Sequence, residues 1–181
     1  MSTAATGPAP PRTALVLRAL GLGDLLTGIP ALRALRRGLP EHRIVLAAPR
    51  ALEPLVRLSG AVDVMTHLPG LVPPTVDGPV DVAVDLHGRG PASHDPLRRT
   101  RPRELMAFDV AGGPRWDPDE HEVPRWCRLV SWYGFPADPA DLDLPVPPRP
   151  SPAPDAVVVH PGAAFAARRW PPERFAEVAA A

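Results

Sequence analysis

The segment Thr13–Leu39 places a short apolar run, a glycine turn and a helical pattern one directly after another. The run Ala14–Ala19 is too short for a stable helix and suits a strand buried on both faces. Apolar residues then recur three or four positions apart, as on one face of a helix. Pro30 should kink that helix or restart it as an N1 residue, and Gly38 should cap its end. The pattern predicts a strand–turn–helix unit whose helix begins at Asp24.

The same alternation continues along the chain. Further apolar runs occupy residues 43–48, 62–68, 80–85, 104–110 and 156–160, and helical patterns occupy 51–58, 122–133 and the residues after 171. Strands that alternate with helices form a parallel sheet covered by helices. The sequence therefore predicts an α/β, Rossmann-like fold with helices on both faces of the sheet.

The distribution of proline along the chain predicts where one domain ends and the next begins. Residues 1–12 have the composition of a disordered tail, 13–135 form the main domain, and 136–154 are a Pro- and Asp-rich linker. Residues 155–181 hold one strand and one helix, too little to bury a core alone. They are expected to begin a second domain whose remainder is missing. The alternative is a single domain in which they join the same sheet.

Composition excludes several classes of function. Twenty basic and twenty acidic residues give no net charge, so nothing favours nucleic acid as a partner. Cys127 is the only cysteine, which rules out an internal disulfide and a cysteine zinc cluster. The sequence contains no H-x-x-H or H-E-x-x-H spacing, so no metal site is predicted. The N-terminus lacks a signal peptide pattern, so a soluble cytoplasmic protein is expected.

The turn Gly21–Asp24 follows the first strand, at the edge where parallel sheets bind ligands. Leu26 occupies the third glycine position of a dinucleotide fingerprint, and no acidic residue ends the second strand. No Gly-Lys-Ser/Thr follows the turn, so a P-loop fails as well. An oxidoreductase is therefore disfavoured. Two roles stay open for Asp24, an ordinary helix N-cap or a general base that the helix dipole keeps ionised.

A second strand-to-helix turn lies at His160–Trp170. Gly162 and the small residues after it leave backbone N–H groups accessible, and Arg168 and Arg169 add positive charge. Such a loop suits an anion or a phosphate. A plain loop with solvated arginines explains the same composition.

Four segments, taken in order, resemble glycosyltransferase family 9, the ADP-heptose:lipopolysaccharide heptosyltransferases and their relatives. They are Leu15–Arg36, Asp81–His87, His121–Val123 and His160–Pro171, the last similar to the family's His-Pro-Gly-Ala…Lys-x-Trp-Pro motif. The resemblance implies a GT-B architecture, in which a first Rossmann-like domain holds the acceptor and a second holds a nucleotide-sugar donor.

The resemblance also implies roles for individual residues. Asp24 matches the catalytic base of a metal-independent, inverting transfer, with Gly21, Gly23 and His87 on the acceptor side. The implied contacts to the donor phosphate come from Gly162, Ala163, Ala164 and Arg168. Arg168 replaces the usual lysine, Ala164 a frequent Ser or Thr, and His87 a glutamine, and these changes alter the expected contacts.

The implied reaction transfers a sugar, heptose by resemblance, from an ADP-sugar to a cell-envelope glycan or glycolipid, as in lipopolysaccharide biosynthesis. The nucleotide sugar is a co-substrate and no cofactor is implied. A basic patch formed by Arg98, Arg99, Arg101 and Arg103, with His94, fits an acceptor phosphate, the inner membrane face or plain solvent. The family's later Asp-Ser-Gly…His donor motif is missing, so the chain is expected to be an inactive fragment by itself. An inactive remnant or interaction domain stays the alternative.

Overall fold

The computed structural model describes residues 12–163 and 165–181, which form two compact units divided after Pro145. The donor-side residue Ala164 lies outside the described residues. The predicted tail 1–12 does so as well, except for Arg12, which is the first residue of a strand.

The first unit is built on one parallel sheet with the strand order β3-β2-β1-β4-β5. At its centre, Leu15 of β1 pairs with Val45 of β2 on one side and Ala83 of β4 on the other. The α/β, Rossmann-like prediction is confirmed. The strands are β1 (Arg12–Leu17), β2 (His42–Ala48), β3 (Val64–His67), β4 (Val82–Asp85) and β5 (Glu104–Met106).

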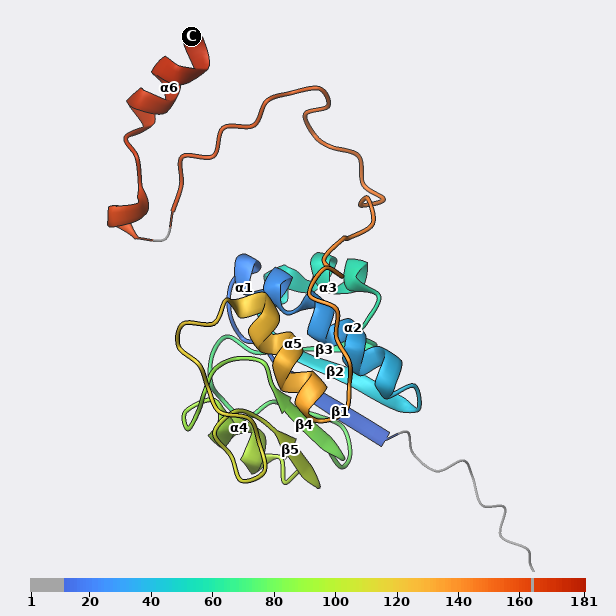
Figure 1. The fold of residues 1–181 in the computed structure, drawn as a ribbon. Helices are drawn as coiled ribbons and strands as arrows, with labels where there is room; N and C mark the ends of the chain where they lie inside the picture. The colour runs from blue at the N-terminus through green and yellow to red at the C-terminus, as the bar shows by residue number, and fades with distance from the viewer. Residues whose placement is uncertain (1–11, 164) are drawn as a thin grey trace, which may run out of the picture. The chain divides into compact units, whose positions relative to one another are not determined.

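Helices cover both faces of this sheet, as predicted (Figure 1). Alternate strand residues such as Val16 and Ile44 pack beneath α2, α3 and α5, whereas Leu15 and Val45 face the side that holds Leu97 of α4. The helices of the first unit are α1 (Leu22–Thr27), α2 (Ile29–Gly38), α3 (Glu53–Ser59, after the short η1 at Arg50–Leu52), α4 (His94–Arg99) and α5 (Glu122–Trp132).

The prediction that the helix after the first strand restarts near Pro30 is confirmed, since the pattern forms two helices. It breaks at Gly28, and Pro30 lies in the first turn of the restarted helix α2. The first of the two begins at Leu22, so the prediction that Asp24 opens it was wrong by two residues. The reason is that Gly21 takes the N-cap position, and Asp24, three residues later, bonds back to its N–H.

Gly38 was predicted to cap the end of α2, and this prediction was wrong. It is the last residue of that helix and Leu39 is the cap. A Cβ atom at Gly38 would lie 2.2 Å from Cδ1 of Phe135, so the glycine makes room for this aromatic ring. Phe135 packs against the core shared by α2 and α5.

Only part of the predicted linker 136–154 connects the two units. Residues 136–145 belong to the first unit. Arg33 of α2 holds them through an ion pair of 2.6 Å with Asp141 and a hydrogen bond of 2.6 Å to the carbonyl oxygen of Asp143. Ala137 and Leu144 pack against the core.

The second unit contains a short 3-10 helix, η2 (Ala166–Arg168), and the helix α6 (Pro172–Ala180). The strand predicted at 156–160 is not formed, and Val157 is 92% exposed. A strand requires a neighbour for its backbone N–H and C=O groups. None of the described residues pairs with this segment.

The described helices include none whose length and apolar character suffice to cross a membrane.

Candidate functional site

The centre of the sheet creates a topological switch point. From β1 the chain passes through α1 and α2 on one face, and from β4 it passes through α4 on the other. In open parallel sheets, ligands bind in the crevice that this divergence leaves at the carboxyl ends of the two strands. Asp24 follows β1 and His87 follows β4, so two of the predicted site residues lie at the edge that this rule selects.

Asp24 is half-buried in the first turn of α1. Its Oδ2 atom accepts a hydrogen bond of 2.9 Å from the backbone N–H of Gly21, which stabilises the start of the helix. A carboxylate has about four acceptor positions, so this bond leaves it able to accept others. A Cβ atom at Gly23 would have no neighbour within 4 Å, so the turn is open beside the carboxylate. The capping and general-base roles are therefore compatible.

His87 belongs to a turn that Asp85 organises. Asp85 is fully buried, and its Oδ1 atom accepts a hydrogen bond of 2.8 Å from the backbone N–H of His87. Burial lowers the pKa of the His87 imidazole, against the raising effects of the Asp85 and Asp24 charges. The lowered pKa favours the neutral imidazole, whose Nδ1 atom is buried without a hydrogen-bond partner among the described residues.

Beneath this turn, Asp85 faces His94 of α4. The Oδ2 atom of Asp85 and the Nε2 atom of His94 are 3.5 Å apart and both are buried. Burial raises the pKa of Asp85 and lowers the pKa of His94, because it penalises the charged form of each. Because His94 is buried against Asp85, its predicted place in the exposed basic patch was wrong.

The sequence interpretation missed Arg18, a buried cation between the two turns. Its side chain is 1% exposed and forms an ion pair of 2.7 Å with Glu122 of α5. The guanidinium also lies 4.6 Å from the centre of the Trp126 ring. Desolvation lowers the pKa of Arg18, and the charges of Glu122, Asp24 and Asp85 oppose that shift.

One feature of the sequence indicates that Arg18 is a buried charge with partners. It is a charged residue at the end of an apolar run that predicts a buried strand, and a buried charge needs partners. Its main partner, Glu122, lies 104 residues away. No local pattern connects two residues at that separation.

The described donor-side residues, Gly162, Ala163 and Arg168, lie in the second unit. Gly162 and Arg168 are exposed, and Ala163 is half-buried. Arg169 donates a hydrogen bond of 2.7 Å from Nε to the carbonyl oxygen of Ala163, which folds the loop back on itself. The guanidinium of Arg168 lies 5.7 Å from the centre of the Phe165 ring.

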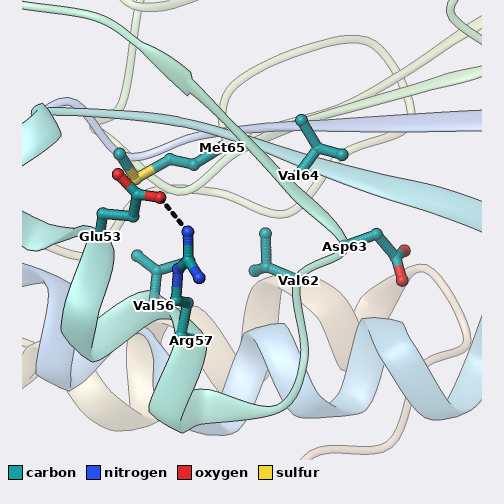
Figure 2. A pocket seen from close by; sticks show the side chains of 7 residues that line it. All are labelled: Glu53, Val56, Arg57, Val62, Asp63, Val64 and Met65. Carbon is teal, nitrogen blue, oxygen red and sulfur yellow. Dashed lines mark hydrogen bonds and ion pairs between the residues drawn. The ribbon is translucent and has the colours of Figure 1, made fainter.

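The hollow that Figure 2 shows lies elsewhere, between α3 and the edge strand β3. It has a volume of about 410 Å³, and an ion pair of 2.6 Å between Arg57 and Glu53 lies on its wall. None of the predicted site residues lines it. Within residues 12–163 and 165–181, no three His, Cys, Asp or Glu side chains are grouped to hold a metal ion.

Comparison with protein-family models and with curated protein sequences gives no match. Solved structures do match. The glycosyl transferase family 9 protein from Veillonella parvula shares 16% identity with a TM-score of 0.66, over 93% of this chain and 58% of its own. E. coli heptosyltransferase WaaC with ADP shares 14% identity with a TM-score of 0.51, over 71% of this chain and 51% of its own.

WaaC with ADP-2-deoxy-2-fluoro heptose matches similarly, with 15% identity and a TM-score of 0.50. The chain thus spans little more than half the length of each of these proteins. At such low sequence identity, the similarity to these structures shows the fold alone. The chain has the fold of two solved glycosyltransferases over most of its length.

Proposed function

We propose that this chain carries the acceptor-binding half of a family 9 glycosyltransferase of the GT-B type. The observation that carries the proposal is the half-buried Asp24 carboxylate, which stands at the switch point of a sheet shared with solved glycosyltransferases. A base at that position is suited to take a proton from a substrate bound in the crevice.

The proposed reaction is an inverting displacement. Asp24 accepts the proton of an acceptor hydroxyl while the hydroxyl oxygen attacks the anomeric carbon of the donor sugar. The bond from that carbon to the diphosphate oxygen breaks, and the nucleoside diphosphate leaves with the bonding electron pair. Arg168 and the backbone N–H groups of Gly162 and Ala163 are proposed to bind the departing phosphates, because fixed donors stabilise developing negative charge.

We propose an ADP-sugar, with heptose as the first candidate, as the donor, and no cofactor besides it. The support is the fold shared with WaaC, which has been solved with ADP and with an ADP-linked fluoro heptose. Under this proposal His87 contacts the acceptor, because a neutral imidazole nitrogen can bond a sugar hydroxyl as donor or as acceptor, according to its tautomer.

We further propose that the acceptor is an anionic glycan or glycolipid of the cell envelope, as in lipopolysaccharide biosynthesis, reached from the cytoplasmic side. Arg98, Arg99, Arg101 and Arg103 are all exposed and are proposed to attract its phosphates or an anionic membrane face.

Replacing Arg98, Arg99 and Arg101 together by Gln should weaken sedimentation with vesicles that contain phosphatidylglycerol. Replacing Arg12, Arg43 and Arg50 instead provides the charge-matched control. Equal binding by the two triple variants would contradict this part of the proposal.

The test of the reaction is the release of ADP from ADP-heptose by the intact protein that contains this chain, with a cell-envelope extract as acceptor. Asp24→Asn removes the base and keeps the shape of the side chain. It should lower the rate by about 100-fold or more, the usual contribution of a general base.

Asp95→Asn is the matched control, because Asp95 is an exposed carboxylate on α4 whose nearest cation, Arg98, lies 3.7 Å away. It should keep the wild-type rate. A near-normal rate for Asp24→Asn would remove the general-base role. Failure of the wild-type protein to release nucleotide from any ADP-sugar would refute the donor class.

A further inference from the structure

The guanidinium of Arg18 joins the two turns of the candidate site. Its Nε atom donates a hydrogen bond of 2.7 Å to the carbonyl oxygen of Asp24, in α1. Its Nη1 atom donates to the carbonyl oxygen of Leu86, the residue before His87. One side chain therefore fixes backbone atoms next to both predicted site residues.

The other side of the same guanidinium bonds Thr27, the last residue of α1, and Glu122, the first residue of α5. Its Nη2 atom donates to Oγ1 of Thr27 at 2.9 Å and to Oε2 of Glu122 at 2.7 Å. That carboxylate oxygen also accepts from Thr27 at 3.1 Å and from Nε1 of Trp126 at 3.3 Å. Because the guanidinium is planar and rigid, bonds on several of its edges set its orientation, and with it the positions of both turns.

Other contacts hold each turn separately: Leu25 fixes α1 in the core, and the His87 turn bonds the side chain of Asp85. Helix α1 has six residues, fewer than an isolated helix needs to be stable in water, and Gly28 separates it from α2. His87 lies in an irregular segment after β4. The placement of Asp24 and His87 must therefore come from tertiary contacts, and Arg18 contacts both turns.

The positive charge of Arg18 also connects the two turns. Arg18 is a buried cation on which three carboxylates act, those of Glu122, Asp24 and Asp85. Removing the cation would leave these acidic groups without their shared counter-charge in a partly desolvated site.

We propose that Arg18 is a positioning residue that holds the Asp24 turn and the His87 turn in one fixed arrangement. The inference rests on the proposed function, because the arrangement matters for transfer only if these turns bind the acceptor. A displacement of about 1 Å between reacting groups is enough to lower a rate about 100-fold.

The first measurement does not depend on activity. Arg18→Lys keeps the charge but cannot bond all four acceptors with one rigid fork. Hydrogen exchange followed by NMR should show at least ten-fold faster exchange for the amide protons of Leu25, in α1, and His87, with the amides of β2 unchanged. Arg33→Lys is the matched control, since Arg33 also joins separate segments through four hydrogen bonds, to Ser59, Asp141 and Asp143. It should leave both turns at wild-type rates.

The second measurement is ADP release from ADP-heptose by the intact protein. Arg18→Lys should lower kcat at least ten-fold with KM changed less than three-fold, whereas Arg33→Lys should keep the wild-type kcat. Unchanged exchange at both turns would overturn the proposal, and so would opened turns with a wild-type kcat. If the wild-type protein proves inactive, the proposed function fails, and exchange at the two turns alone decides whether Arg18 holds them.

If Arg18→Lys does not fold, Glu122→Gln provides a milder test. It removes the anion that anchors Arg18 and keeps the carbonyl bonds, so exchange at Leu25 and His87 should rise at least three-fold. Glu120→Gln removes a neighbouring carboxylate that pairs with Arg128 at 2.6 Å, and should leave both turns unchanged. Equal exchange in the two glutamine variants would overturn the proposal.

Discussion

Glu122 opens helix α5 and shares one carboxylate oxygen among Arg18, Thr27 and Trp126. Burial by itself raises its pKa, but the hydrogen bond and charge of Arg18, with the bonds from Trp126 and Thr27, lower the pKa further than burial raises it. The net pKa is below the ordinary value of 4.5. The ionised carboxylate therefore stabilises the folded chain above that pH, and the contribution is lost as the pH falls through the lowered value.

The first residue-scale prediction concerns this pH dependence. The melting temperature of the wild-type chain should exceed that of Glu122→Gln at pH 7, and the difference should shrink steadily below about pH 4.5. Thermal melts followed by circular dichroism between pH 3 and pH 7 measure it. Glu53→Gln is the control, because the exposed Glu53–Arg57 pair on α3 contributes little to stability at any pH. A constant difference between wild type and Glu122→Gln would contradict the assignment.

A second residue-scale prediction concerns Cys127, which lies inside α5 and is 4% exposed. Burial, with the nearby charges of Asp138 and Asp141, raises the pKa of its thiol to about 11. Since the thiolate is the reactive form, Cys127 should resist Ellman's reagent at pH 8 in the native chain and react within seconds in guanidinium chloride. Cys127→Ser should give no colour in either state. Rapid reaction in the native chain would show that α5 opens readily.

At the scale of elements, sequence patterns identify what local chemistry determines. The apolar run Ala14–Ala19 indicates β1 because β1 is buried on both faces, and the spacing in 122–133 indicates α5. Helix α4 was missed because six residues rich in charge carry no readable periodicity. The run 156–160 has the pattern of a strand, but a strand also needs a partner. The patterns locate the turn that holds Asp24, whereas the contacts of Arg18 and Glu122 depend on the tertiary fold.

The prediction at this scale concerns the approach of α2 to Phe135. In an exposed helix Gly38→Ala would stabilise by about 1 kcal/mol. Here the new methyl group meets the Phe135 ring at 2.2 Å, and overpacking of this kind costs about 1–3 kcal/mol. Urea titration should therefore show a less stable Gly38→Ala chain. Adding Phe135→Leu should restore part of the loss, because the smaller side chain vacates the space. A more stable single variant would mean that the ring moves aside freely.

At the scale of the whole molecule, residues 12–145 contain both apolar clusters of the sheet and every hydrogen bond of the Arg18 network. A chain shortened to end at Pro145 should therefore fold and melt within about 2 °C of the full chain. One that ends at Phe135, where the sequence placed the domain boundary, also loses the bonds of Arg33 to Asp141 and the packing of Leu144. Each lost kcal/mol lowers the melting temperature of a domain of this size by roughly 4 °C.

Calorimetry of the three chains separates these contributions. The chain that ends at Phe135 should melt at least 4 °C below the chain that ends at Pro145, because Arg33 is left with unpaired donors and part of the core is uncovered. Asp141→Asn in the full chain should reproduce part of that loss by weakening the ion pairs with Arg33 and Arg37. Equal melting temperatures for the two shortened chains would mean that residues 136–145 act as a linker. A large loss on shortening to Pro145 would mean that the sheet and its two helical layers depend on residues 146–181 for their stability.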